Sequence, residues 1–295
     1  MTVYIQQHTS GAGKWIYTGY KYAWEALGYT VVYFNKPIKP VDDYYVMITD
    51  GLAPQYVDFI SNSKKCFLYT QPNYFPEPWG SHPNFQCHCP DELITQFNSM
   101  SNIKKWTFGD GNNEPYYTKW KNVTTVPLGF DNFCYESKKV NYKYDVCFVG
   151  GVANNGFNEK IVIMNKTLGY LMNDTSINCG FFINKNLTHL QENYILNASK
   201  ITINIHDAYQ RELQLDSNER TFKSLGVNGL LVSDKINQIK RLFPFVEMEN
   251  NNKELASLIL EHINDPELES KKEKNRNYIL NNHTYTHRIN QLLAI

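Results

Sequence analysis

The chain has 295 residues, enough for two domains of ordinary size or one large one. It carries 29 Lys and Arg against 29 Asp and Glu, so its formal net charge is zero and no global field attracts nucleic acid or anionic membrane. A hydrophobic share of 42% with 20% charge excludes a disordered chain and a coiled coil, and the 14% aromatic share favours stacking or sugar-facing surfaces.

Location and redox state follow from the apolar and cysteine patterns. No apolar stretch approaches the roughly 18 to 20 residues that span a bilayer, and residues 1–7 lack the pattern of a signal peptide. We therefore expect a cytoplasmic protein with no integral membrane association, and reduced thiols at its six cysteines. The cluster Cys87-His88-Cys89 lacks a second pair of ligands at zinc-site spacing, so we expect no metal site.

The first part of the chain alternates strand-like and helical patterns, which is typical of parallel βαβ units. Strands are predicted at residues 3–5, 30–34, 44–48 and 66–69, and helices near 14–27 and 54–61. Five prolines then interrupt residues 71–90 and predict a long loop that carries Tyr74, Phe75 and Trp79. Long loops in compact domains are usually functional, so we assign Tyr74 and Trp79 to the acceptor side of a binding site.

A second alternating series follows. Strands are predicted at residues 144–149, 177–183, 201–205 and 230–233, and helices near 158–171, 187–197 and 219–225. Two such series predict an α/β fold with two Rossmann-like lobes that face each other across a cleft. We place the first lobe at 1–140, the second at 141–282, and a final helix in 283–295 that crosses back to the first lobe with its apolar stripe of Ile289, Leu292 and Leu293.

Ligands of open parallel sheets bind outside the carboxyl ends of the strands, which directs attention to the loops there. Residues 8–14 (HTSGAGK) follow the first strand, and Gly11 and Gly13 let the backbone approach an anion at the start of a helix. The spacing is not that of a P-loop. His8 has a pKa suited to a general base that deprotonates an acceptor hydroxyl, although a histidine hydrogen-bonded into a loop explains it equally well.

Polar residues follow the strands of the second lobe as well. Gly150, Gly151 and Asn154-Asn155-Gly156 present backbone amides after the strand at 144–149. Asn204 and His206 follow the strand at 201–205 and are able to contact ribose or sugar hydroxyls, or to form a simple polar turn.

Residues 218–234 form a short amphipathic helix, a glycine-bounded turn and an apolar strand that ends at an aspartate. Arg220, Phe222, Gly226 and residues 230–234 resemble the carboxyl-terminal lobe of group 1 glycosyltransferases (GT-B fold), particularly the branch of spore maturation protein B. The resemblance continues through residues 243–244 and 255–263 to the HTYTHR run at 283–288, and it covers about 144–293.

The resemblance implies a metal-independent enzyme that transfers a sugar from a nucleotide sugar, with no cofactor beyond that co-substrate, which we expect to be a nucleoside diphosphate sugar. Two positions depart from the family: Lys223 replaces a glutamate that grips the donor ribose, and Gly151 replaces an arginine. We therefore expect Arg220 and Lys223 to neutralise the departing diphosphate. The expected catalytic residues are His8, Arg220 and Lys223, and the expected donor-binding residues are Gly11, Gly13, Gly150, Gly151, Asn204, His206, Glu219, Gly226 and Asn228.

Several alternatives stay open at this point. The resemblance favours retention of the anomeric configuration, whereas His8 acting as a base favours inversion. The acceptor is a glycan, protein, lipid or modified DNA. In the last case a DNA-modifying glycosyltransferase acts on a hydroxylated base, and the loop with Tyr74 and Trp79 stacks an extruded base. If Lys223 abolishes donor binding, the protein is a non-catalytic nucleotide- or carbohydrate-binding protein of the same fold.

Overall fold

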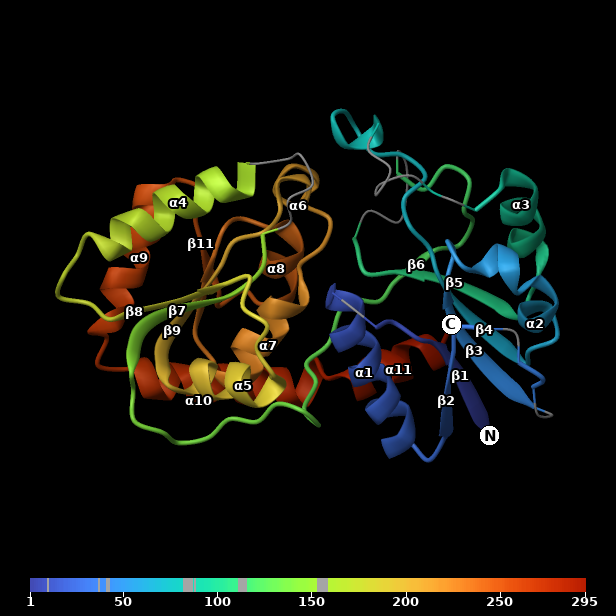
Figure 1. Ribbon diagram of the computed structural model, residues 1–295, viewed down its shortest axis with the longest axis horizontal. Coiled ribbons are helices and arrows are strands. Elements are labelled where there is room, and N and C mark those ends of the chain that lie inside the picture. The colour runs from blue at the N-terminus through green and yellow to red at the C-terminus, as the bar shows by residue number, and fades with distance from the viewer. Residues whose placement is uncertain are drawn as a thin grey trace. The chain divides into compact units, whose positions relative to one another are not determined.

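Two parallel sheets organise the chain, one in each of two units (Figure 1). The computed structural model describes residues 1–9, 11–36, 38–40, 43–81, 87, 89–110, 116–152 and 159–295. Unit 1 comprises Met1–Pro127 together with Tyr285–Ile295, and unit 2 comprises Leu128–Thr284.

Unit 1 is built on a six-stranded sheet of order β2-β1-β3-β4-β5-β6, with every pairing parallel. Its strands are β1 (Thr2–Gln6), β2 (Thr30–Phe34), β3 (Tyr44–Thr49), β4 (Lys65–Tyr69), β5 (Ile103–Thr107) and β6 (Thr124–Thr125). Its helices are α1 (Gly11–Ala26), η1 (Ala53–Gln55), α2 (Val57–Ser61), η2 (Trp79–Ser81), α3 (Asp91–Ser99) and α11 (Tyr285–Leu293). Val3, Tyr4 and Ile5 are all buried, as expected for a central strand covered on both faces.

The last helix, α11, packs against α1 within unit 1. The ring of Tyr285 fills the space where a side chain at Gly19 would lie, and it contacts the ring of Tyr20 at a centroid distance of 4.7 Å. Ile289 and Leu292 of the predicted apolar stripe are fully buried. The prediction that the final helix returns to the first lobe is therefore confirmed.

Unit 2 is built on a five-stranded parallel sheet of order β11-β10-β9-β7-β8. Its strands are β7 (Tyr144–Gly150), β8 (Cys179–Ile183), β9 (Ser199–Asn204), β10 (Leu231–Ser233) and β11 (Glu247–Met248). Its helices are α4 (Glu159–Met172), α5 (His189–Asn197), α6 (Ala208–Leu213), α7 (Glu219–Val227), α8 (Asn237–Leu242), α9 (Asn252–Ile263) and α10 (Leu268–Asn282). The side chains of Phe148, Ile203 and Val232 from three neighbouring strands form the centre of its core.

The two sheets share one strand order. In each, the first strand lies between the second and the third, so the chain direction across the sheet reverses between the first and third strands. In folds of this kind ligands bind at that switch point, beyond the carboxyl ends of the two strands. The switch point lies after β1 and β3 in unit 1, and after β7 and β9 in unit 2.

Some elements differ from the predicted ones. The helix predicted at residues 54–61 is divided into η1 and α2 at Tyr56, whose φ of −133° is not helical. The sequence pattern also gave no indication of α3, β5 and β6. β5 was missed because two adjacent lysines, Lys104 and Lys105, interrupt its apolar run, and β6 has only two residues. No described helix combines the length and apolar character that a membrane crossing requires.

Candidate functional site

Arg220 occupies the switch point of unit 2. It stands in the first turn of α7, which begins because the side chain of Asn218 accepts a hydrogen bond from the backbone of Thr221. The Arg220 guanidinium donates from Nη1 to Oδ1 of Asn204 at 2.6 Å and lies 4.8 Å from the ring centroid of Phe148. Asn204 ends β9 and Phe148 lies in β7, so the two strands at the switch point hold the cation from both sides.

Gly150 is the residue that lets the guanidinium approach the end of β7. A Cβ at this position would overlap the Arg220 guanidinium, whereas a Cβ at Gly151 would only meet Oδ1 of Asn184 at 3.2 Å. A glycine is thus required at 150 for steric reasons that do not apply at 151. Gly150, Asn204 and Arg220, all predicted from the sequence, are brought together.

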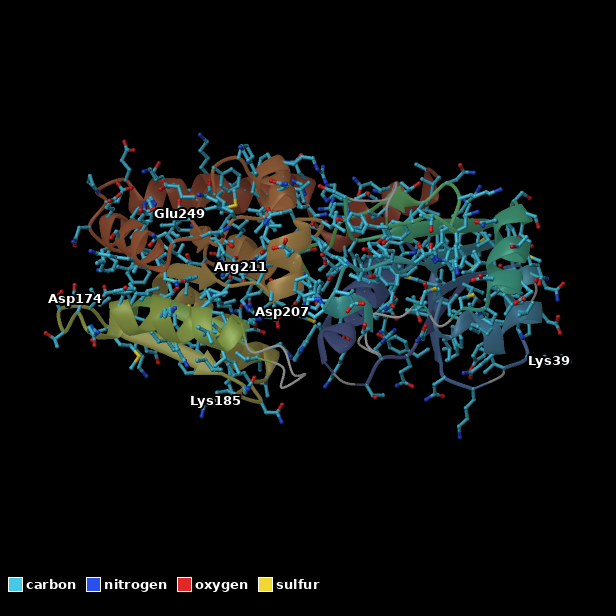
Figure 2. All side chains as sticks on the ribbon, turned by 90° about the horizontal axis from the view of Figure 1, so that it is seen from above. Lys39, Asp174, Lys185, Asp207, Arg211 and Glu249 are labelled. Carbon is cyan, nitrogen blue, oxygen red and sulfur yellow. The ribbon has the colours of Figure 1, made fainter. Side chains whose placement is uncertain are left out.

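Two further cations belong to this part of unit 2, and sequence reasoning missed both. Lys160, in the first turn of α4, is buried and pairs with Asp207 at 2.9 Å. Burial and the neighbouring positive charge of Arg220 lower the pKa of Lys160, against the opposing effect of Asp207. Arg211 of α6, labelled with Asp207 in Figure 2, lies 3.6 Å from Asp234 through Nε. Its Nη1 is buried without a hydrogen-bond partner among the described residues.

His206 belongs to a buried network behind Asn204. Its Nδ1 lies 2.6 Å from Oδ1 of Asp234, its backbone N–H donates to Oδ2 of Asp234 at 2.9 Å, and its Nε2 lies 3.2 Å from Oγ of Ser217. Burial would raise the pKa of Asp234, but His206 and Arg211 lower it overall. Because His206 is fully buried, it orients Asn204, whose Nδ2 lies 3.3 Å from its Nε2, rather than facing the site.

Lys223 lies one turn further along α7 and is paired within the protein. Its Nζ lies 2.7 Å from Oε1 of Glu192 and 3.6 Å from Oε1 of Glu219. Tyr135 donates to the other oxygen of Glu192 at 2.7 Å. Burial would raise the pKa of Glu219, but the charges of Lys223 and Arg220 lower it overall. The charge that the sequence assigned to the donor phosphates is thus engaged with two carboxylates.

Gly226 and Asn228 lie away from Arg220, at the other end of α7. The ring of Phe130 fills the space beside Gly226, and the Asn228 side chain donates to the backbone oxygens of Leu196 and Ser199. Asn228 precedes β10, so it belongs to the amino-terminal edge of the sheet. The structure does not bring these two residues together with the switch-point group.

His8 follows β1 at the switch point of unit 1. Its ring stacks on Tyr17 with centroids 4.2 Å apart, and Gly13 leaves room for it, since a Cβ there would lie 2.8 Å from Nδ1. The Nε2 atom of His8 is buried with no hydrogen-bond partner in the described part of the chain. Burial lowers the pKa of His8, which therefore carries an unprotonated nitrogen at neutral pH. Gly11 begins α1 with a φ of +60°.

The two aromatic residues assigned to the acceptor side differ in accessibility. Tyr74 is 50% exposed and lines a pocket of about 420 Å³ with Asn73 and Lys119, whereas Trp79 in η2 is buried. Ser10, His88 and the run Asn154-Asn155-Gly156 lie outside the described residues. Within the described residues, no group of three or more His, Cys, Asp or Glu side chains is arranged to hold a metal ion.

Residues 164–294 match the family model described as "Glycosyl transferase-like". They include most of unit 2 and α11. A comparison with curated proteins gives no match.

Solved structures extend the comparison to both units. TarM matches 97% of this chain with a TM-score of 0.55 and 12% identity, and a mutant of S. aureus TarM in complex with fondaparinux, alpha-GlcNAc-glycerol and UDP matches 93% with a TM-score of 0.59 and 11% identity. The chain spans 58% and 57% of those two structures. An alpha-glucosyltransferase in complex with UDP and a 13-mer DNA matches 99% of this chain over 98% of its own length, with a TM-score of 0.54 and 9% identity.

The fold is that of GT-B glycosyltransferases. The predicted architecture of two Rossmann-like lobes is therefore confirmed, and the match to the glycosyltransferase-like model covers residues 164–294. The resemblance to the branch of spore maturation protein B remains a prediction.

Proposed function

We propose that the protein transfers a sugar from a nucleoside diphosphate sugar, bound by unit 2, to a hydroxyl of an acceptor bound by unit 1. The observation that carries this proposal is the Arg220 guanidinium, held by Asn204 and Phe148 and admitted by Gly150 at the switch point of a glycosyltransferase-like domain.

The charges around Arg220 suit a diphosphate. Glycosyl transfer places negative charge on the departing phosphate, so cations fixed in advance stabilise the transition state. Burial and the charge of Arg220 lower the pKa of Lys160, and an anion between the two cations would relieve their repulsion. The backbone amides after β7, at Gly151 and Val152, are further candidates for the phosphate oxygens, although Val152 N–H already donates to Oδ1 of Asn184.

Lys223 takes a supporting part in this proposal. Its pair with Glu192 joins α7 to α5, and Glu192 is further fixed by Tyr135. A buried pair of this kind holds the start of α7, and with it Arg220, at a fixed position. Contact between Lys223 and the donor would require exchange of a carboxylate partner for a phosphate oxygen.

His8 is the proposed base of the acceptor reaction. Its buried, unpaired Nε2 and lowered pKa equip it to accept a proton from a hydroxyl. Reaction through such a base inverts the anomeric configuration, whereas the family resemblance favours retention. The anomeric configuration of the product separates the two. We also propose that no metal ion is needed, which activity in the presence of a chelator tests.

A second acceptor class has support of its own. The alpha-glucosyltransferase matched over 98% of its length is in complex with a 13-mer DNA, and Tyr74 is an exposed aromatic residue on the loop after β4. We therefore include DNA with a hydroxylated base among the acceptors to test. The non-catalytic alternative is a protein that binds the same nucleotide sugar without transferring it.

Donor binding is tested first, by thermal shift with UDP, GDP and ADP. UDP leads because two matched structures contain it. We expect one of the three to raise the melting temperature of the wild type and not of Arg220→Ala; no stabilisation at millimolar concentration would refute the donor site. Release of the nucleoside diphosphate from a panel of nucleotide sugars then separates a transferase from a binding protein.

A further inference from the structure

A pocket of about 420 Å³ lies at the carboxyl edge of the sheet in unit 1. It is formed by the loop that follows β4, by the start of α3 and by Lys119, and its volume is in the usual range of ligand sites. Because β4 pairs with β3 and β3 pairs with β1, the pocket is next to the switch point after β1 and β3. We call it the Tyr74 pocket, and its aromatic and polar lining includes Asn73, Tyr74, Phe75, Glu77, Asp91 and Lys119.

An aromatic wall is the first feature of the Tyr74 pocket. Tyr74 is half exposed, although an aromatic ring gains free energy by burial, and Phe75 belongs to the same wall. The flat faces of a sugar ring consist of C–H groups. Such a face contacts an aromatic ring favourably, through the apolar area that both bury and through the negative charge of the aromatic face.

Carboxylates are the second feature. Glu77 is exposed, and its two oxygens lie 2.7 and 2.8 Å from Oγ of Ser81, which fixes the group. Asp91, the first residue of α3, pairs with Nζ of Lys119 at 2.7 Å. Each carboxylate has about four sites that accept hydrogen bonds, so both groups are able to accept further bonds from hydroxyls. A ligand that suits them brings O–H donors, which phosphodiester oxygens lack.

The charge around the Tyr74 pocket is negative among the described residues. Glu77 and Asp91 outnumber Lys119 in the lining. A third carboxylate, Asp50, is buried directly after β3, with Oδ2 3.9 Å from Sγ of Cys87. Burial, and then the charge of Asp50, raise the pKa of the Cys87 thiol, which lines the same pocket. Negative charge at this edge disfavours the phosphates of a nucleic acid.

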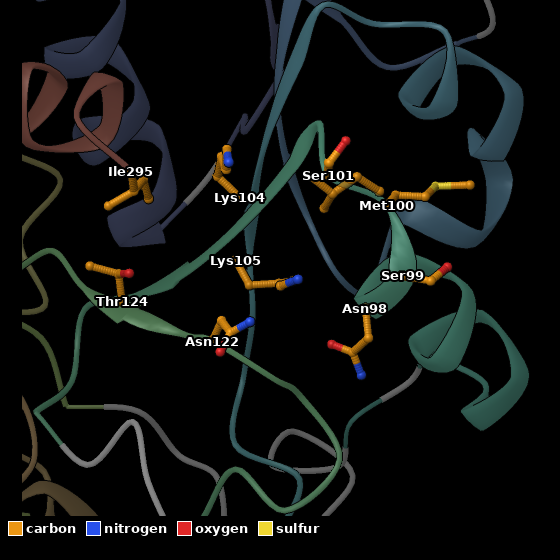
Figure 3. A pocket seen from close by; sticks show the side chains of 10 residues that line it. Asn98, Ser99, Met100, Ser101, Lys104, Lys105, Asn122, Thr124 and Ile295 are labelled. Atoms are coloured by element: carbon orange, nitrogen blue, oxygen red, sulfur yellow. The ribbon is translucent and has the colours of Figure 1, made fainter.

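The adjacent lysines of unit 1 do not offset this charge. Lys104 and Lys105 are consecutive residues of β5, so their side chains leave opposite faces of the sheet. They lie around another pocket, of about 290 Å³, at the amino-terminal edge where α3 ends and β5 begins (Figure 3). The Tyr74 pocket is at the other edge of the same sheet.

We propose that the Tyr74 pocket binds a neutral sugar residue of the acceptor, so that the acceptor is a glycan. This inference rests on the proposed function, because it places the acceptor in unit 1. A sugar residue combines C–H faces that contact Tyr74 with hydroxyls that donate to Glu77 and Asp91. It brings no charge to a negative site, whereas DNA would bring phosphates close to carboxylates.

The test measures acceptor binding in the absence of any nucleotide. Saturation-transfer difference NMR on the full chain uses the methyl glycosides of glucose, galactose, mannose and N-acetylglucosamine, and a single-stranded DNA oligonucleotide that contains 5-hydroxymethylcytosine. We expect a saturable signal from at least one glycoside at millimolar concentration and none from the oligonucleotide. Arg220→Ala should bind the glycoside equally well. A protein that binds a nucleoside diphosphate but no glycoside would therefore refute this inference and leave the donor site standing.

Matched variants locate the sugar. Tyr74→Ala should weaken binding of the glycoside by about fourfold or more, because the apolar contact is lost, and Tyr74→Phe should retain most of the affinity. Glu77→Ala should weaken it roughly tenfold, because a hydroxyl loses a charged acceptor. Tyr22→Ala removes a tyrosine of α1 that is 37% exposed and should leave the affinity unchanged.

Three results would each overturn the proposal. The first is wild-type affinity for the glycoside in Tyr74→Ala. The second is the absence of a saturable signal with all four glycosides. The third is binding of the oligonucleotide that Tyr74→Ala abolishes, which would identify Tyr74 as a platform for an extruded base instead.

Discussion

The two units place different chemistry at equivalent positions of the same sheet topology. In unit 2 the switch point holds charged groups, Arg220 and Lys160, with the buried Asp234 behind them. In unit 1 the corresponding place holds the stacked pair of His8 and Tyr17 and no cation among the described residues there, with the buried carboxylate of Asp50 directly after β3. Each of these two places lies beyond the carboxyl end of the first strand of its parallel sheet, β7 in unit 2 and β1 in unit 1.

This difference shows that the strand order fixes where a site lies, whereas the side chains at that place determine which ligand it binds. Fixed cations suit a ligand that carries permanent negative charge, such as a diphosphate. A neutral imidazole with an unpaired nitrogen suits a hydroxyl that must lose a proton. Exchange or removal of these groups should therefore affect donor and acceptor steps separately.

Removal of the Arg220 charge should have the largest effect. We expect Arg220→Ala to lower turnover by roughly 10²-fold or more, because the developing phosphate charge loses its main counter-ion. Arg220→Lys should recover only part of the lost turnover. The planar guanidinium can bond Asn204 and a phosphate oxygen at the same time, whereas the lysine ammonium is a single point charge. Steady-state kinetics with the donor identified by thermal shift measure both.

The control for Arg220 is Arg241→Ala, which removes an exposed arginine from α8 of the same unit. Near wild-type turnover in Arg220→Ala, with Arg241→Ala also unchanged, would reduce Arg220 to a structural role.

His8 tests the other half of the comparison. We expect His8→Gln to lower transfer by about 10²-fold, the usual contribution of a general base, while the affinity for the nucleoside diphosphate stays unchanged. Because burial lowers the pKa of His8, wild-type kcat/KM should fall only on the acid side of 6.5, and the variant should lack that limb. His189→Gln in unit 2 is the control. A variant that kept the acid limb would show that another group titrates.

The fold was predictable because apolar runs separated by polar turns recur at βαβ spacing. β2 begins and ends where the pattern places it and α11 lies within the predicted 283–295, whereas β5 was missed because Lys104 and Lys105 interrupt its apolar run. Strand register and order depend on pairings far apart in the sequence, such as β7 with β9, which no local pattern contains.

The site was predictable where a residue ends a strand or belongs to the pattern that resembles the family. Gly150 and Asn204 end β7 and β9, and Arg220 belongs to that pattern at the start of α7. Gly226 was assigned with them, yet six residues of helix rise about 9 Å, which carries it away from Arg220 toward the other edge of the sheet. Lys160 was missed because it stands in an ordinary helical turn and reaches the site only through the fold.

Gly150 and Gly151 allow a test of whether Arg220 contacts the donor phosphates from its observed position. Gly150→Ala should displace the Arg220 guanidinium and weaken binding of the nucleoside diphosphate by about tenfold or more, since one charged contact is worth 1.5–3 kcal/mol. Gly151→Ala meets only the flexible end of Asn184 and should bind normally. Titration calorimetry on both variants gives the ratio. Equal affinities would mean that Arg220 does not contact the phosphates from its observed position.

The smallest effect concerns Lys272 of α10, a buried lysine that has three acceptors: Tyr142 Oη and the backbone oxygens of Ser199 and Lys200. Burial lowers its pKa to about 8 from the ordinary 10.5, so between these values the unfolded chain binds more protons than the folded one. The free energy of unfolding should therefore gain a rising contribution from about pH 8 to 10. Urea unfolding of wild type and Lys272→Met at several pH values should show a difference in stability that grows across this window. A difference that is independent of pH would mean that Lys272 keeps its proton, as a fully compensated ion does.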